Sequence, residues 1–245
     1  MNSKLSSKEY FRFKEFKLRN RDTALKVNTD GVLLAAWAHL PQEGKVLDIG
    51  TGGGLIACIV ASRSPQLHIL GIDISEIAIA EARHNVDINP QFANLSFGLK
   101  SYQEMLEDEG RGIFDLIISN PPFFDTNMPS SIAATAAAKH IKSLSPEIIL
   151  KSAHRLLSEE GSFSLITENR NLQANIQLAK MNNLILSRLC RVRPKPSKPQ
   201  NRMLMEFRKS PTKKKNCITE LVIRNEDNSY HILYKNLTNQ LYLNF

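Results

Sequence analysis

Residues 45–54 read KVLDIGTGGG, and this stretch decides the fold class of the 245-residue chain. The apolar run that ends at Ile49 predicts a buried strand, and the glycines from Gly50 onward predict a turn that opens a helix over 55–64. A strand that enters a helix through a glycine-rich turn is typical of an open α/β sheet, where ligands bind beyond the carboxyl ends of the strands. The sequence therefore predicts a ligand site at this turn.

Strand and helix patterns alternate along most of the chain. Strands are expected at 45–49, 67–73, 95–99, 114–119, 162–167, 184–192 and 203–208, and helices at 55–64, 75–89, 145–157 and 169–182. This alternation predicts an α/β fold with a mostly parallel sheet flanked by helices. Three prolines make 193–199 a loop, and the strand after it is expected to lie antiparallel near one edge of the sheet. The pattern over 232–245 assigns no element.

The first 42 residues precede this alternation. Phenylalanines and basic residues alternate over 11–14, and a second short apolar run follows at 24–27, which predicts a two-stranded hairpin. Thr29-Asp30-Gly31 carries an N-cap signal for a helix that ends before Pro41. The expected domains are a basic N-terminal extension over 1–42, packed on the core, and a main domain over 43–245 that includes basic C-terminal strands and a tail.

The composition is that of an ordinary globular protein, with 42% hydrophobic and 23% charged residues. No stretch approaches the roughly 18 apolar residues of a membrane span, and the first residues lack the apolar core of a secretory signal. The spacing of Cys58, Cys190 and Cys217 indicates neither a disulfide framework nor a zinc site. We expect a cytoplasmic protein with no membrane span and no metal ion; the oligomeric state is left open, with a monomer favoured.

The net charge of +8 is unevenly distributed. Residues 1–27 hold eight Lys and Arg against three Asp and Glu, and residues 188–224 hold twelve against two, so the rest of the chain is acidic. Basic segments on an acidic core are typical of a partner with a phosphate backbone. The alternative is a pair of solvated basic faces that only keep the protein soluble.

The glycine spacing narrows the ligand class. A dinucleotide-binding turn would have its third glycine at the sixth position, where this chain has Leu55, and this argues against NAD. The tight turn with a preceding acid resembles motif I of class I S-adenosylmethionine-dependent methyltransferases. The resemblance implies a Rossmann-like class I sheet and S-adenosylmethionine as the cofactor. The residues that it places at the cofactor are Asp48, Gly50, Gly52, Gly54, Asp73, Ser101 and Asn120.

Three of these residues have individual roles in that resemblance. Asp48 would lie near the methionine ammonium group. Asp73 ends the next expected strand, where a carboxylate is suited to accept hydrogen bonds from a ribose diol. Ser101 stands where class I enzymes often place an acid that binds the adenine amine.

Asn120-Pro121-Pro122-Phe123 ends the fourth strand of the main domain and is the most specific chemical signal in the chain. An exocyclic aromatic amine is a poor nucleophile, because its lone pair is delocalised into the ring. The Asn120 side-chain carbonyl and the Pro121 backbone carbonyl can each accept one N–H of the amine and favour its attacking form. The prolines hold these carbonyls rigid, and Phe123 can stack on an unstacked base. We therefore expect all four residues to be catalytic, and we nominate no general base.

The motifs together resemble the bacterial tRNA (adenine-N6)-methyltransferase family that acts on valine tRNA. The resemblance rests on the opening Phe11-Arg12-Phe13-Lys14, on Lys26 to Gly31, on the two motifs above and on Arg193-Pro194-Lys195-Pro196. It implies methylation of adenine 37, next to the anticodon. The residues expected to contact RNA are Arg12, Lys14, Arg19, Arg21, Lys139, His140, Arg193, Lys195, Lys198 and Arg202.

Three alternative functions would use the same motifs. A protein-glutamine N5-methyltransferase needs the same two acceptors, but a protein substrate gives no reason for the basic segments. A DNA adenine methyltransferase would need a target-recognition domain, and no segment of useful size is left for one. A non-catalytic RNA-binding protein could retain the core, although Asp48, Asp73 and Asn120 are all intact.

Overall fold

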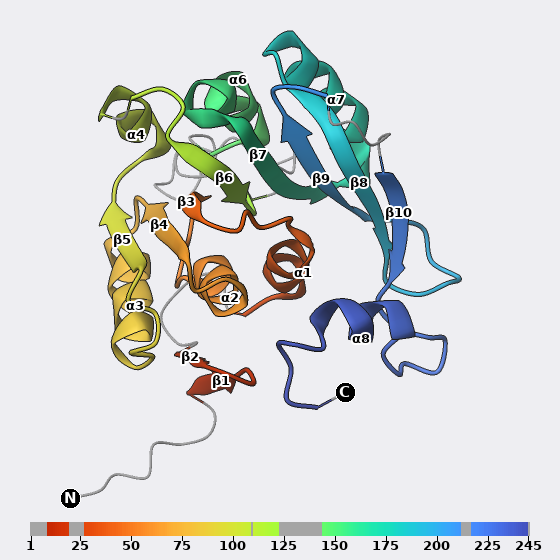
Figure 1. The fold of residues 1–245 in the computed structure, drawn as a ribbon. Coiled ribbons are helices and arrows are strands. Elements are labelled where there is room, and N and C mark those ends of the chain that lie inside the picture. The colour runs from red at the N-terminus through yellow and green to blue at the C-terminus, as the bar shows by residue number, and fades with distance from the viewer. Residues whose placement is uncertain (1–8, 20–26, 109, 123–143, 212–216, 245) are drawn as a thin grey trace, which may run out of the picture.

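The computed structural model describes residues 9–19, 27–108, 110–122, 144–211 and 217–244. Eight strands form one sheet in the order β10-β8-β9-β7-β6-β3-β4-β5 (Figure 1). The strands are β3 Gly44–Ile49, β4 Leu67–Asp73, β5 Leu95–Leu99, β6 Phe114–Ser119, β7 Leu157–Glu168, β8 Ile185–Arg193, β9 Arg202–Arg208 and β10 Cys217–Val222. β9 runs antiparallel to β7 and β8, whereas the other neighbours are parallel. The predicted mostly parallel sheet, with an antiparallel strand near one edge, is confirmed.

Helices cover both faces of this sheet (Figure 1). One face carries α1 Thr29–Trp37, α2 Leu55–Arg63 and α3 Glu76–Asp87, and the other carries α4 Tyr102–Asp108, α6 Pro146–Leu156 and α7 Leu172–Met181. Each face has its own apolar core, because strand side chains alternate between the two faces: Val46 packs in one core and Leu47 in the other. The short helix η1 Asn169–Asn171 and the C-terminal helix α8 Ile232–Thr238 complete the described elements.

The sequence pattern explains how each layer forms. In α6, Ser145 accepts a hydrogen bond from the Ile148 amide, Pro146 stands in the first turn, and Ile149, Leu150, Ala153 and Leu156 are buried. This is an amphipathic helix with an N-cap and a proline where its missing N–H costs nothing. α1 is buried from Gly31 to Ala36, so it belongs to the interior of its layer. Its N-cap is Asn28, one residue before the predicted signal.

The N-terminal hairpin differs from the prediction. β1 Tyr10–Arg12 pairs with β2 Lys17–Arg19, so the partner of the first strand lies earlier in the chain than the predicted second strand at 24–27. The chain turns earlier because Phe13 and Phe16 are both buried, with ring centroids 4.5 Å apart, and the Phe13 amide donates to the Phe16 carbonyl at 2.8 Å. Residues 24–26 lie outside the described residues.

Besides β2, three described elements were not predicted, namely α4, β10 and α8. β10 extends the sheet beside β8, and α8 packs against α1. The chain after α8 then reaches the hairpin, where the Leu241 carbonyl accepts from the Lys14 amide at 2.8 Å and the Tyr242 ring stacks on Phe13. The two ends of the described chain therefore support each other.

Candidate active site

The glycine turn follows β3 and lies beside the carboxyl ends of the two strands that flank β3. β3 is flanked by β4 and β6, and the amides of Gly50 and Thr51 both donate to the Ile72 carbonyl, at 2.9 and 3.0 Å. Gly50, Gly52 and Gly54 all have positive φ angles, of 70°, 56° and 84°. Other residues rarely adopt this conformation, so the glycines that the sequence singled out are the ones that the turn requires.

Asp48 is fully buried beneath the turn. Its Oδ2 accepts from the Thr51 hydroxyl at 2.7 Å, whereas Oδ1 is buried without a hydrogen-bond partner among the described residues. The pKa of Asp48 is raised to about 7, mainly because the group is buried and to a smaller extent because of the charge of Asp73, whereas the Thr51 hydrogen bond lowers it. The nearby Ala57 amide also lowers the pKa of Asp48, although it does not form a full hydrogen bond with Oδ1. An ammonium group is the kind of donor that this oxygen lacks, so Asp48 fits the amino-acid end of S-adenosylmethionine.

Asp73 is the last residue of β4 and binds the glycine turn at Gly52. One Asp73 oxygen accepts from the Gly52 amide at 3.0 Å, and the other accepts from the Ser75 amide at 2.9 Å. The carboxylate is thus held by two backbone groups at the carboxyl end of β4, and a carboxylate at this place is suited to accept hydrogen bonds from a ribose diol. A Cβ atom placed on Gly52 would meet nothing within 4 Å, so the backbone there is open to a ligand.

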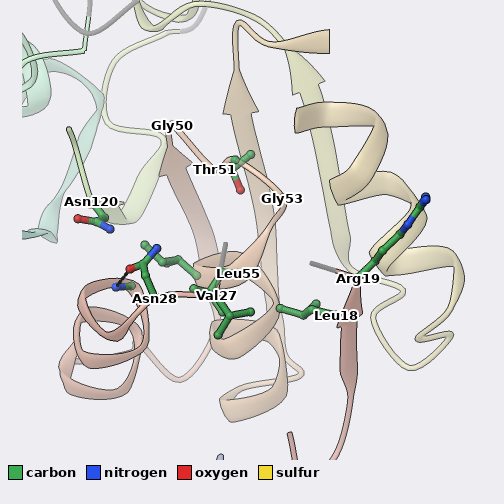
Figure 2. Close-up of a pocket in the computed structure, with 12 residues that line it drawn as sticks. Leu18, Arg19, Val27, Asn28, Gly50, Thr51, Gly53, Leu55 and Asn120 are labelled. Carbon is green, nitrogen blue, oxygen red and sulfur yellow. Dashed lines mark hydrogen bonds between the residues drawn. The ribbon is translucent and has the colours of Figure 1, made fainter. Parts of the chain in front are cut away.

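Asn120 follows β6 and lies beside the turn. Ser119 is paired with Ile49, and its hydroxyl donates to the Ile49 carbonyl at 2.9 Å. Asn120 and Gly50 are therefore the next residues along two neighbouring parallel strands, and both line one pocket (Figure 2). Pro121 is buried, and Pro122 is partly buried. The chemistry motif and the cofactor motif thus converge in a single pocket.

Most of the rest of that pocket comes from the N-terminal segment. Its lining includes Leu18 and Arg19 of the hairpin and Val27, Asn28 and Gly31 before and within α1, together with Leu55 and Ile56 of α2 (Figure 2). The sequence prediction included only Arg19 from this set, and as an RNA contact. Position could have indicated Val27, Asn28 and Gly31, since they lie in the segment that carried the family resemblance; Leu18 lies outside that segment.

A second, smaller hollow adjoins Asp73. Ile74, Lys100, Tyr102 and Leu144 line it together with the Gly50 side of the turn. Tyr102 is buried, its hydroxyl accepts a hydrogen bond from Ser152, and burial raises its pKa to about 12. These residues were missed, because Ile74, Tyr102 and Leu144 look like ordinary core residues in a sequence and Lys100 looks like an ordinary surface residue.

Ser101 does not line this hollow but precedes α4. Its hydroxyl accepts from the Glu104 amide at 3.2 Å, and its own amide and hydroxyl donate to Glu104 Oε2, at 2.7 Å each. This reciprocal arrangement is a capping box. The predicted contact of Ser101 with adenine stays a prediction.

The basic residues fall into two described groups. In the hairpin, Arg12 and Lys14 are exposed, and Arg19 forms an ion pair with Glu9. In the proline-rich loop, Arg193 pairs with Glu220, the Lys195 ammonium donates to the Glu226 carbonyl, and Lys198 is exposed.

Arg202 begins β9 and is bound to two acids. Its Nε lies 2.9 Å from Asp30 Oδ2, and its Nη1 lies 3.9 Å from Glu168. It therefore connects the carboxyl edge of the sheet to the first turn of α1. Phe123, Arg21, Lys139 and His140 lie outside the described residues.

In the described ranges, no group of three or more His, Cys, Asp or Glu side chains could hold a metal ion. No helix in the described part of the chain is long and apolar enough to cross a membrane.

Solved structures resemble the chain in fold. A predicted O-methyltransferase from Agrobacterium tumefaciens has a TM-score of 0.65 at 17% identity, covering 86% of this chain and 96% of that one. The P. horikoshii TYW2 structure in complex with MeSAdo has a TM-score of 0.57 at 11% identity, covering 82% and 71%. The fold is that of the class I S-adenosylmethionine-dependent methyltransferases.

Sequence comparisons give the family. Residues 26–185 match the family described as "Methyltransferase small domain". Proteins named tRNA1(Val) (adenine(37)-N6)-methyltransferase are similar over nearly the whole chain. The one from Vibrio parahaemolyticus is 35% identical over 95% of both chains, and the one from Pseudoalteromonas translucida is 37% identical over 95% of this chain and 98% of its own. This chain belongs to the tRNA1(Val) (adenine(37)-N6)-methyltransferase family of S-adenosylmethionine-dependent methyltransferases.

Proposed function

We propose that this protein transfers the methyl group of S-adenosylmethionine to N6 of adenine 37 in a valine tRNA. The observation that carries the proposal is the shared pocket, in which Asn120 lies beside the glycine turn. An acceptor for an amine and a cradle for the methyl donor thus meet at the ends of two adjacent strands. The family membership supplies the adenine and the tRNA.

The residues of this chain would act mainly on the amine. When bound, S-adenosylmethionine supplies an electrophilic methyl group on a sulfonium sulfur. The Asn120 side-chain carbonyl and the Pro121 backbone carbonyl each accept one N–H of N6, which concentrates the nitrogen lone pair toward that methyl. A nitrogen–carbon bond forms as the carbon–sulfur bond breaks, and the amine proton leaves to water. Pro122 restricts the backbone after these acceptors, and we propose that Phe123 stacks on the base.

The basic groups would bind the phosphate backbone on either side of this pocket. Arg12, Lys14 and Lys17 line a hollow of about 430 Å³ on the hairpin. Arg193, Lys195 and Lys198 lie in the loop after β8, which ends at the same sheet edge as β6 and β7. We assign tRNA contacts to these residues and to Arg19, Arg21, Lys139, His140 and Arg202. We place the reaction in the cytoplasm.

The decisive experiment is transfer of radiolabelled methyl from S-adenosylmethionine to total tRNA from a strain that lacks the protein, followed by nucleoside analysis. We expect N6-methyladenosine in valine tRNA alone. Asn120→Ala should lower kcat by about a thousandfold, as loss of a pre-organised hydrogen-bonding group can do, with cofactor affinity largely kept. Label on a translation-factor protein instead of RNA, or near-normal activity of Asn120→Ala, would overturn the proposal.

Salt dependence tests the basic surface separately. The logarithm of the apparent tRNA affinity should fall linearly with the logarithm of salt concentration. Replacing Lys14 or Lys198 by Gln should each make the slope shallower by about 1, because one phosphate contact is lost. A slope that neither variant changes would remove these residues from the RNA surface.

A further inference from the structure

A buried asparagine lies between two walls of the active-site pocket. Asn85 belongs to α3 and is 1% exposed. Its Nδ2 donates to the Gly53 carbonyl at 2.9 Å, and its Oδ1 accepts from the Arg19 amide at 2.7 Å. One carboxamide therefore joins the glycine turn to the N-terminal hairpin.

Both partners of Asn85 line the pocket (Figure 2). Gly53 is part of the turn that cradles the cofactor, and Arg19 ends the hairpin strand that carries basic residues. A carboxamide is planar, and a buried one has no water to replace a lost partner. A displacement of the hairpin at Arg19 is therefore opposed by the bond at Gly53, and the reverse also holds.

A second asparagine anchors the hairpin alone. Asn89, 3% exposed, accepts from the Lys17 amide at 3.1 Å and donates to the Lys17 carbonyl at 2.7 Å. Its Nδ2 also donates to the Asn85 backbone carbonyl at 2.6 Å. Among the described residues it forms no bond to the glycine turn. The chain thus offers two buried asparagines on one helix end, only one of which reaches the cofactor wall.

We infer that Asn85 is a positioning residue that couples RNA binding at the hairpin to S-adenosylmethionine binding at the glycine turn. The inference rests on the proposed function for its RNA side. When tRNA fixes the hairpin, the Arg19 amide holds the Asn85 carboxamide, which in turn holds the Gly53 carbonyl in its place in the cofactor wall. Because coupling between two ligands is reciprocal, bound cofactor must strengthen tRNA binding by the same factor.

The experiment measures the affinity for S-adenosylhomocysteine by calorimetry, with and without valine tRNA, for the wild type, Asn85→Ala and Asn89→Ala. In the wild type, tRNA should strengthen binding by about fivefold, the lower end of usual coupling. Asn85→Ala should weaken binding without RNA by about tenfold, because it removes the partner of two partly buried backbone groups, and should abolish the effect of tRNA. Asn89→Ala should raise the KM for tRNA but change cofactor affinity without RNA by less than about twofold.

Kinetics and folding separate positioning from damage. At saturating cofactor and tRNA, the kcat of Asn85→Ala should stay within about threefold of the wild type, because Asn85 does not touch the reacting atoms. Equal losses of cofactor affinity in the two variants, or an unchanged affinity in Asn85→Ala, would overturn the inference. If Asn85→Ala unfolds, the absence of any tRNA effect in the wild type would still refute the coupling. Cofactor binding without any methylation of tRNA would instead refute the proposed function.

Discussion

The glycine turn and the basic appendages are held in different ways, although the hairpin and the turn line one pocket. The turn is fixed by neighbours, since Gly50 and Thr51 donate to Ile72 of the adjoining strand. The appendages, meaning the hairpin 9–19 and the C-terminal segment 193–244, are fixed by distant partners. Lys14 bonds to Leu241, and Arg202 pairs with Asp30 across 172 positions. The cofactor site is thus encoded locally, whereas the proposed RNA surface depends on the whole chain.

Because of this difference, we expect variants in the two regions to affect the binding of different ligands. A change in the turn should alter cofactor affinity and leave tRNA affinity nearly intact. A change in the appendages should do the opposite. Asn85 is the exception, because it belongs to both regions.

The largest effect is expected from Asp48→Asn. This variant removes the buried charge that we assign to the cofactor ammonium, so cofactor affinity at pH 8 should fall by about a hundredfold or more. Calorimetry at pH 8 measures the loss, and the KM for tRNA should change little. A large tRNA effect would contradict the separation of the two regions.

The pH dependence of Asp48 gives a second test. Its pKa is raised to about 7 from an ordinary 3.8, so between these values the folded protein binds a proton that the unfolded chain does not. The unfolding free energy of the cofactor-free protein should therefore fall as pH rises from about 4 to 7, and this contribution should be absent in Asp48→Asn. Cofactor affinity should rise over the upper part of that range, because the ammonium pairs with the charged carboxylate. Urea unfolding at pH 5 and pH 8 provides the measurement.

A smaller effect is expected from Gly52→Ala. At φ 56° an alanine costs about 1–2 kcal/mol of unfolding free energy. Its methyl group would enter the space open to the cofactor, which should raise the KM for S-adenosylmethionine by about tenfold. Gly98→Ala is the matched control, because a Cβ there meets only ordinary contacts at 3.8 and 4.0 Å. Equal KM values in the two variants would show that Gly52 does not face the cofactor.

The Arg202–Asp30 pair tests the appendages. Its side chains are 26% and 23% exposed, so it should contribute little to stability. If Arg202 mainly holds α1, Arg202→Met and Asp30→Asn should raise the KM for tRNA equally, by about threefold. If Arg202 also contacts RNA, as the sequence predicted, Arg202→Met should have the larger effect and a shallower salt slope. We expect the second result, with cofactor affinity unchanged in both variants.

The sequence predicted the sheet and the cofactor turn because their signals are local. The glycine spacing and the acids at two strand ends need only the strand order to bring them together. The pairing of Lys17–Arg19 with Tyr10–Arg12 was missed because two buried phenylalanines made a tight turn look like a continuing strand. α8 and the tail were missed because they pack on α1 and on the hairpin, partners at least 195 positions away in the sequence.

The site residues that were predicted also have local sequence signals, and those that were missed do not. Residue type and position at the end of a strand were enough to predict Asp48, the glycines, Asp73 and Asn120. They were not enough for Asn85 and Asn28, because a polar residue in or before a helix is ordinarily a surface residue or a cap. Only the fold shows that Asn85 reaches the glycine turn from α3.

The smallest effect is expected from Ser101→Ala, which tests the weakest of the predicted cofactor contacts. The capping box uses the hydroxyl as donor and acceptor, so its loss should lower the unfolding free energy by about 1 kcal/mol. One lone pair of the hydroxyl remains for the adenine amine, and losing that single bond should raise the KM for S-adenosylmethionine by up to about fivefold. Ser145→Ala, which removes the equivalent cap of α6, should cost similar stability without affecting this KM. If the two variants behave alike, Ser101 is a helix cap only, and the adenine is held by the Ile74, Lys100 and Tyr102 side of the hollow.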